Sequence, residues 1–417
     1  MGLRYAIIGS GSLGTANSQA RGVKEEIDDV VIYSRNKKIK NQIQKTHQNK
    51  VYFPGITLHP KIRAEDIDYK KINEADVIEI DTLTNALNDV GEGIKSHYRN
   101  QPIIFTCKGM VNRNGVPMFP QEALKDILGE NAPILFLYNN AFARAIIKED
   151  FTFNAIACED IKLAEEITNL ISTEHYKILE KSGDVIGLEI MAIMKNIVAI
   201  GMGMAESLGI SRSSQCGILY EGRREMMALG KQLGAEEKTF FGISLEDFWL
   251  TGLGKESRNW QFGNQFSRNK KRGRFNPRRQ ISAVSAKIRR RKHRNVLDDL
   301  RDLYEGIIVA GLADGIHDAL DSPFILGRTV RDTIFNTISR VPFPEASEGT
   351  FTVPSLLQRV RAEGMTLPIV EGLHEVLFGG ASTRATMTHI LEVVQCDETG
   401  KDTGNILDYK LMDSWSR

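Results

Sequence analysis

The segment RYAIIGSGSLG, residues 4–14, is the strongest indication of the fold of the first half of the chain. A short apolar run suited to a buried strand leads directly into a turn with three glycines. Further runs of this kind are VVIYS (30–34), ADVIEI (75–80), PIIFTC (102–107) and PILFLY (133–138). Helical sequence separates most of them. This alternation predicts a parallel sheet with helices on both faces.

The glycine turn has the spacing of a dinucleotide-binding fingerprint, with Gly9, Gly11 and Gly14 in its three glycine places. These glycines would allow, in that order, a tight turn, the approach of a pyrophosphate to the backbone, and close packing of helix on strand. Ser12 and Leu13, which lie between these glycines, are further candidate cofactor contacts. Glycine turns also occur for purely structural reasons, but the strand before this one and the helix after it favour a dinucleotide at the helix N-terminus.

The end of the second predicted strand bears on the choice of cofactor. An NAD-selective site usually carries an acidic residue there, about 20 residues beyond the turn, for the ribose hydroxyls. This chain has Ser34 and Arg35 instead. Because arginine can pair with a 2′-phosphate, the sequence favours NADP(H), with NAD(H) as the alternative.

The pattern changes after Asp184, where strand signals largely vanish and helical segments such as 186–209 and 215–234 follow. We therefore expect a dinucleotide-binding domain at 1–183 and a helical substrate domain at 184–417. The expected fold is a Rossmann-type α/β domain with a doubly wound, mostly parallel sheet, followed by an all-α domain. A chain of 417 residues, 41% of them apolar, is long enough for two such domains.

Several features favour the cytoplasm. The N-terminus MGLRYAIIG lacks the layout of a signal peptide, and no apolar run approaches the ~20 residues that a bilayer requires. The four cysteines are scattered, with neither metal-ligand spacing nor a disulfide framework, so we expect a reducing compartment and no metal site.

One lysine stands out in the segment LEIMAIMKNIVAIG, residues 188–201. On a helix, the neighbours of Lys195 three, four and seven positions away are Leu188, Met191, Ala192, Val198 and Ala199. Burying an unpaired ammonium costs several kcal/mol or more. The lysine therefore either extends its charged end to water or has a partner elsewhere in the chain.

Several stretches together resemble the soluble, bacterial-type NAD(P)-dependent glycerol-3-phosphate dehydrogenase family, in family order and near-family spacing. They are GSGSLGTA, YSRN, NKVYFPG, TCKGM, DVIGLEIMAIMKNIVAIGMG, GISLEDFWLTGLGKESRNWQFG and SEGTFTVPSLLQRVRAEGMTLPIVEGLHEVLFGG. The likeness covers most of residues 1–263 and about 347–393. Its specific part is the Lys-Asn pair on a helix with an aspartate and Ser-Arg-Asn downstream.

The resemblance implies reversible reduction of dihydroxyacetone phosphate to sn-glycerol 3-phosphate for glycerophospholipid synthesis, by a homodimer. Lys195 matches the family's catalytic lysine and Asp247 its acidic partner, and both would also contact the substrate. Apolar surroundings lower the pKa of an amine and prepare it for proton transfer. The carboxylate would hold the ammonium and offset the cost of its burial.

Further candidates follow from the same resemblance. Ser257, Arg258 and Asn259 resemble a phosphate clamp, in which arginine offers a planar fork to phosphate oxygens and also reaches the cofactor. The alternative is a helix N-cap followed by a surface arginine. Lys108, in TCKGM, resembles a contact shared by substrate and cofactor, and Glu348, in SEG, resembles a late cofactor contact.

The chain departs from the family at two loops. Residues 138–144, YNNAFAR, replace the usual Ser-Gly-Pro-Ser/Thr-Phe-Ala, although the Phe-Ala pair is kept. Asn139 and Ala141 are candidate substrate contacts there, although Ala141 lacks the usual hydroxyl, and Ala143 is a candidate cofactor contact. DTLT at 81–84 replaces the usual proline after the third predicted strand.

The largest departure is an expected insertion at about 264–346. Its basic run, 268–294, is typical of a solvated face, and binding of nucleic acid or a membrane surface is the less favoured reading. LYEGI at 303–307 could supply the glutamate in place of Glu348. Two other functions stay open: a related two-domain dehydrogenase for another small carbonyl compound, and a cofactor-binding protein tethered through the basic insertion.

Overall fold

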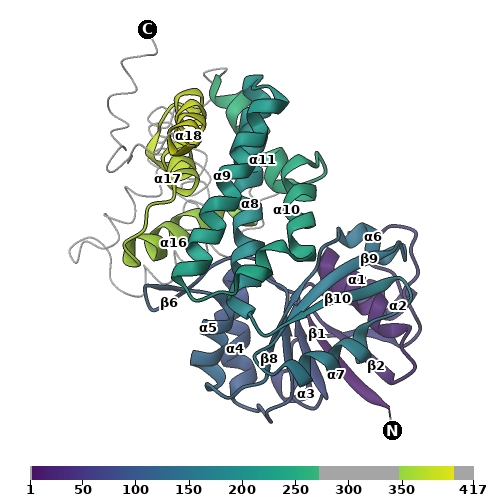
Figure 1. The fold of residues 1–417 in the computed structure, drawn as a ribbon. Coiled ribbons are helices and arrows are strands. Elements are labelled where there is room, and N and C mark those ends of the chain that lie inside the picture. The colour runs from purple at the N-terminus through teal and green to yellow at the C-terminus, as the bar shows by residue number, and fades with distance from the viewer. Residues whose placement is uncertain (1, 272–346, 399–417) are drawn as a thin grey trace, which may run out of the picture. The chain divides into compact units, whose positions relative to one another are not determined.

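The computed structural model describes residues 2–271 and 347–398, which are coloured in Figure 1. They form two compact units. The first comprises the described part of Met1–Lys195 together with Met226–Leu250, and the second comprises Asn196–Glu225 and the described part of Thr251–Arg417. Three helices, α8 (Val185–Leu208), α9 (Arg212–Gln232) and α10 (Ile243–Leu253), run from one unit into the other. The last strand ends at Ser182, near the expected boundary at 183, but the compact units exchange segments beyond that point.

The first unit is built on an eight-stranded sheet in the order β10-β9-β8-β5-β4-β1-β2-β3. Its strands are β1 (Leu3–Ile8), β2 (Ile27–Tyr33), β3 (Ile62–Glu65), β4 (Val77–Ile80), β5 (Ile103–Phe105), β8 (Ile134–Tyr138), β9 (Thr152–Ala157) and β10 (Tyr176–Ser182). Neighbouring strands are parallel except β8 and β9. A separate antiparallel hairpin joins β6 (Val111–Arg113) and β7 (Val116–Met118).

The five predicted strands correspond to β1, β2, β4, β5 and β8. The sequence did not predict β3, β9 and β10, which lie toward the two edges of the sheet. In β3 and β10 buried residues alternate with more exposed ones, so neither contains the continuous apolar run that marks a central strand. These strands depend on pairing with neighbours that are distant in sequence.

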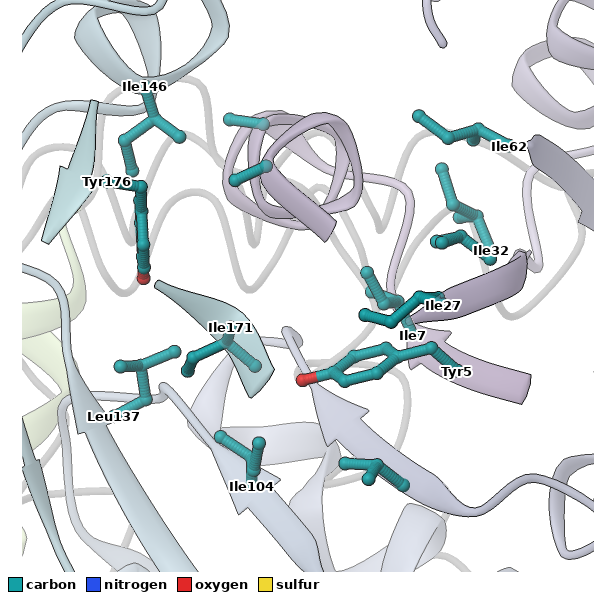
Figure 2. Packing of buried hydrophobic residues seen from close by; sticks show 14 of the residues in the cluster. Tyr5, Ile7, Ile27, Ile32, Ile62, Ile104, Leu137, Ile146, Ile171 and Tyr176 are labelled. Atoms are coloured by element: carbon teal, nitrogen blue, oxygen red, sulfur yellow. The ribbon is translucent and has the colours of Figure 1, made fainter. Parts of the chain in front are cut away.

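Helices cover both faces of the sheet. One face carries a cluster of buried apolar residues that includes Tyr5 and Ile7 of β1 and Leu137 of β8 (Figure 2). The helices that contribute to this cluster are α1 (Ser12–Gly22), α2 (Lys37–Thr46), α6 (Ala143–Ile147) and α7 (Ile161–Ile171). Helices α4 (Leu87–Lys95) and α5 (Pro120–Leu128) pack together and contribute nothing to it (Figure 1).

The strand order positions the glycine turn. From β1 the chain moves outward through β2 and β3, and then returns to place β4 on the other side of β1. This reversal is a topological switch point, and open α/β sheets bind ligands at the carboxyl ends of the strands beside it. The glycine turn follows β1 there, and Asp81 follows β4. The predicted doubly wound, mostly parallel fold is confirmed.

The described residues of the second unit are helical, as predicted, and include no strand. Besides parts of α8, α9 and α10, the unit contains α11 (Arg258–Lys271), α16 (Glu348–Ala362), α17 (Pro368–His374) and α18 (Thr383–Glu398). Residues 264–271 of the expected insertion continue α11. The rest of it, with most of the basic run and LYEGI, lies outside the described residues.

Helix α8 is long and apolar enough, by length and composition alone, to cross a membrane. The sequence reading did not expect this, because Glu189, Lys195 and Asn196 interrupt its apolar runs. In the structure 94% of its most apolar 18-residue window is buried inside the protein. Such burial is typical of a core helix.

Candidate active site

The glycine turn has the geometry that a dinucleotide requires. Gly9 has a φ of +132°, and a Cβ there would lie 2.3 Å from the carbonyl oxygen of Asp81. A Cβ on Gly14 would lie 2.1 Å from the carbonyl oxygen of Gly9, so both places accept only glycine. Nothing lies within 4 Å of a Cβ on Gly11, which leaves open space where a pyrophosphate would approach. Ser12 begins α1 at this turn.

A buried polar network lies beneath the turn. Asp81 accepts hydrogen bonds from Asn17 Nδ2 at 3.0 Å and Thr106 Oγ1 at 2.6 Å. Asn17 Nδ2 also donates to Glu79 Oε1 at 2.8 Å, and Glu79 forms an ion pair with Arg21 at 3.1 Å. Burial, and then the charge of Glu79, raise the pKa of Asp81 to about 8. Our reading of the sequence missed this network, although polar residues inside α1 and β4 were the available signal.

At the end of β2 the structure presents a cation. Arg35 is exposed, whereas Ser34 is buried with its Oγ 2.6 Å from Ser10 Oγ in the glycine turn. Asn36 caps α2 by accepting from the backbone N–H groups of Lys38 and Ile39. The residues that end β2 and begin α2 thus carry positive charge beside the turn, which suits a phosphate on the ribose.

Lys195 has a partner. Its Nζ donates a hydrogen bond to Asp247 Oδ2, and the two side chains are only 6% and 5% exposed. The lysine lies on α8 and the aspartate on α10, so packing of two helices forms the pair. The alternative in which the ammonium extends to water is wrong. A buried ion pair of this kind can hold a protonated amine ready for transfer.

The ends of β5 and β8 bring a second lysine to the same unit. Lys108 Nζ donates to the backbone oxygen of Asn139 at 2.7 Å. Asn139 itself is buried, and its Oδ1 accepts from the hydroxyl of Tyr176 at 2.6 Å. Tyr138, just before it, is fully buried, and burial raises the pKa of its phenol well above the usual value. The sequence did not single out this tyrosine.

Two candidates at the end of β8 offer mainly backbone. Ala141 and Ala143 are half-buried and pack against the apolar cluster, as does Leu13 of the glycine turn. Phe142, between the two alanines, is 39% exposed. A ligand could therefore meet the peptide groups of this segment, but no side-chain hydroxyl is present at Ala141.

Ser257, Arg258 and Asn259 begin α11 in the second unit. Ser257 Oγ accepts from the backbone N–H of Trp260 at 3.4 Å, so the serine caps the helix, as the structural alternative proposed. Arg258 is exposed. The clamp interpretation therefore depends on the arginine and the asparagine, whose roles differ.

Asn259 links three separate segments of the second unit. Its Nδ2 donates to Asn196 Oδ1 at 2.9 Å, and its Oδ1 accepts from the backbone N–H of Gly349 at 3.1 Å. Gly349 follows Glu348, the first residue of α16, so Asn259 is bonded to the start of that helix. Asn196 directly follows Lys195 on α8. The sequence analysis gave Asn196 no role, although the Lys-Asn pair was the signal that could have identified it.

The candidates thus fall into two groups. The glycine turn, Arg35, Lys108, Asn139, Lys195 and Asp247 belong to the first unit, and Ser257, Arg258, Asn259 and Glu348 belong to the second. Helix α8 carries the chain from one group to the other between Lys195 and Asn196. Chemically, the first group offers a dinucleotide turn and a buried proton-transfer pair, and the second offers an exposed arginine at a helix N-terminus.

Two family models match this chain. The N-terminal domain of NAD-dependent glycerol-3-phosphate dehydrogenase matches residues 4–164, and the C-terminal domain matches residues 184–287. The glycerol-3-phosphate dehydrogenase (NAD(P)+) of Streptococcus sanguinis is 31% identical over 275 residues, or 64% of this chain and 78% of that protein. The enzyme of the same name from Lacticaseibacillus paracasei is 30% identical over 282 residues, or 65% and 79%.

Solved structures show the same fold. The glycerol-3-phosphate dehydrogenase of Coxiella burnetii superposes with a TM-score of 0.69 at 18% identity, covering 94% of this chain and 99% of that one. The glycerol-3-phosphate dehydrogenase of Saccharomyces cerevisiae gives 0.67 at 15% identity, covering 94% and 100%. At these identities the likeness concerns the fold. The relatives in sequence use a nicotinamide cofactor, as their names state.

Proposed function

We propose that this chain, which belongs to the NAD-dependent glycerol-3-phosphate dehydrogenase family of oxidoreductases, reduces dihydroxyacetone phosphate to sn-glycerol 3-phosphate. The observation that carries the proposal is the buried Lys195–Asp247 pair in the unit that also holds the dinucleotide turn. The product would supply glycerophospholipid synthesis. The protein would act as a homodimer. It would act in the cytoplasm, a reducing compartment that suits Cys158 and Cys216, which form no disulfide.

The glycine turn would hold a nicotinamide cofactor, which would supply the hydride that the carbonyl carbon requires. Lys195 gives a proton from Nζ to the carbonyl oxygen, and in the reverse direction the neutral amine takes the proton back. Asp247 keeps the protonated amine in place and offsets the cost of its burial. Lys108, tied to the backbone of Asn139 at 2.7 Å, contributes a second positive charge toward an anionic substrate.

The substrate phosphate would be held by Arg258, whose guanidinium can donate two parallel hydrogen bonds. Its exposure in the ligand-free chain leaves the guanidinium available. Asn259 would fix the start of α11 through its bonds to Asn196 and Gly349. Glu348 would meet the cofactor from the neighbouring start of α16.

The substrate assignment is tested by following NADPH oxidation with dihydroxyacetone phosphate against a panel of small ketoacids. Arg258→Ala should raise the KM for dihydroxyacetone phosphate by about tenfold to a hundredfold, because a charge-assisted contact is lost. Slow reduction of unphosphorylated dihydroxyacetone should stay nearly unchanged. Lys255→Ala, an exposed cation three residues earlier, is the matched control and should alter neither.

Two results would contradict this assignment. A ketoacid turned over better than dihydroxyacetone phosphate would favour the related dehydrogenase for another carbonyl compound. Equal loss on both substrates in the Arg258 variant would show that the arginine supports the fold or the cofactor, and the phosphate clamp would be wrong.

The preference for NADPH is proposed separately, because the relatives' names allow both cofactors. We expect NADPH to bind more tightly than NADH in a fluorescence titration, and Arg35→Ala to reduce that preference by about 1–3 kcal/mol. Lys45→Ala, an exposed cation in the last turn of α2, should leave the preference intact. Equal affinities of the wild-type protein for the two cofactors would overturn the proposal.

A further inference from the structure

Tyr138 ends β8 inside a column of aromatic rings. Its ring meets that of Phe136 edge-on, with centroids 6.0 Å apart and planes at 81°. Phe136 in turn stacks on Phe105 of β5 at 4.9 Å. All three side chains are fully buried. Tyr138 is therefore the last of three packed rings that join β8 to β5.

Two ammonium groups lie over this ring. Lys108 Nζ is 4.9 Å from the ring centroid and Lys195 Nζ is 5.2 Å from it. Both distances are within the ~6 Å at which a cation is attracted by the negative face of an aromatic ring. The lysines come from the end of β5 and from α8, so this ring is a neighbour that the two groups share.

The hydroxyl of Tyr138 does not explain its burial. Among the described residues its oxygen is buried and has no hydrogen-bond partner. Burying a polar group without a partner is unfavourable, so packing must retain the residue in spite of its hydroxyl. The aromatic face is the part of Tyr138 that interacts with charged groups.

The ring also offsets the repulsion between the two ammonium groups. Lys108 donates to a neutral acceptor, the backbone oxygen of Asn139, and Lys195 donates to the carboxylate of Asp247. Two cations close to one point repel each other, and burial weakens the screening of that repulsion by water. The aromatic ring attracts both cations and leaves both charges in place, whereas a second carboxylate would neutralise one of them.

We propose that the aromatic ring of Tyr138 is a positioning residue that holds the ammonium groups of Lys108 and Lys195 at the end of β8. The catalytic part of this inference rests on the proposed function, because Tyr138 would affect the reaction only through the two lysines. It assigns the role to the ring and none to the hydroxyl. It follows that a phenyl ring should serve as well as a phenol, and an aliphatic side chain should not.

The proposal can be tested without substrate. Protein labelled with ¹³C at lysine Cε would be titrated by NMR, with the resonances of Lys108 and Lys195 assigned from Lys108→Arg and Lys195→Arg variants. Tyr138→Leu should remove the ring-current shift of both resonances and move their titration about half a unit to one unit lower in pH, because the ring favours the charged amine. Tyr138→Phe should retain the wild-type values.

Phe136→Leu is the matched control, because it removes a ring of the same column other than the one over which the two ammonium groups lie. It should lower the melting temperature about as much as Tyr138→Leu while leaving both lysine resonances in place. Tyr138→Phe should melt no lower than the wild-type protein, since it removes only an unpartnered hydroxyl.

Turnover provides the functional readout. With dihydroxyacetone phosphate, Tyr138→Leu should lose about tenfold or more in kcat, and the alkaline limb of its pH profile should move to lower pH. Tyr138→Phe should match the wild-type protein. The positioning role is overturned if Tyr138→Phe behaves like Tyr138→Leu, or if Phe136→Leu shifts the lysine titrations equally. If the NMR results are as expected but the wild-type protein does not turn over dihydroxyacetone phosphate, the proposed substrate is wrong and the positioning role of Tyr138 stands.

Discussion

Lys195 shows how a single residue acquires a function that its local sequence disfavours. Its helix neighbours are apolar, and the ammonium is buried to within a few per cent of its surface. Asp247, 52 positions later, makes that burial tolerable. Removing one partner of such a pair usually destabilises a protein more than replacing both, because an uncompensated charge is left inside.

We therefore expect Lys195→Ala to lower the free energy of unfolding by about 3–5 kcal/mol and to reduce turnover at least ~10²-fold. The double variant Lys195→Met, Asp247→Leu should recover most of the stability and none of the activity. Urea denaturation and steady-state kinetics would measure the two effects. Recovery of turnover in the double variant would show that the lysine is needed for folding alone.

Two glycines allow helices α8 and α11 to pack closely. A Cβ on Gly203 of α8 would lie 2.0 Å from the backbone oxygen of Trp260 in α11. Reciprocally, a Cβ on Gly263 of α11 would lie 2.0 Å from the backbone oxygen of Ile200 in α8. Both obstacles are backbone atoms, which cannot rotate away. The start of α11, with Arg258, is therefore positioned by a helix contact that only glycine permits.

Gly203→Ala should destabilise the protein by about 1–3 kcal/mol or more, because the two helices must move apart. Gly201→Ala, two residues earlier on the same helix, is the control. Its Cβ would meet only Leu373 side-chain atoms at 3.8 Å, so the change should be neutral or stabilising by about 0.5–1 kcal/mol. Thermal or urea unfolding measures both, and equal effects would contradict the packing argument.

The stability of the whole molecule should depend on pH through the network beneath the glycine turn. Burial and the neighbouring Glu79 raise the pKa of Asp81 from 3.8 to about 8, so the folded protein keeps a proton that the unfolded chain releases. Where the folded state binds more protons, stability falls as pH rises. The window is therefore between about pH 4 and pH 8, and stability decreases across it.

Asp81→Asn removes this titration while its amide can still hydrogen-bond with the hydroxyl of Thr106. The difference in free energy of unfolding, wild type minus variant, should fall by roughly 1 kcal/mol per pH unit between pH 5 and pH 8 and then level off. Taking the difference cancels other titrating groups. Parallel pH curves for the two proteins would show that Asp81 is ionised in the folded state.

The local features of this protein could be predicted from its amino-acid sequence. Buried central strands appear as continuous apolar runs. The positive φ of Gly9 and the lack of space for a Cβ at Gly14 both require glycine, so the glycine turn can be recognised from the sequence. The long helices beyond Asp184, and the lysine in the first of them, were equally visible. Such features depend on neighbours within a few residues, which any sequence displays.

The pairings between distant residues could not be predicted in this way and depend on tertiary packing. This packing placed β9 antiparallel to β8, joined Asn196 to Asn259 across 63 positions, and brought the ammonium groups of Lys108 and Lys195 over the ring of Tyr138. Neither β9 nor Asn196 carries a local signal of its partner, and the tyrosine looks like an ordinary strand residue. A contact between residues far apart in the chain is fixed by the packing of whole elements, and one sequence does not record which elements meet.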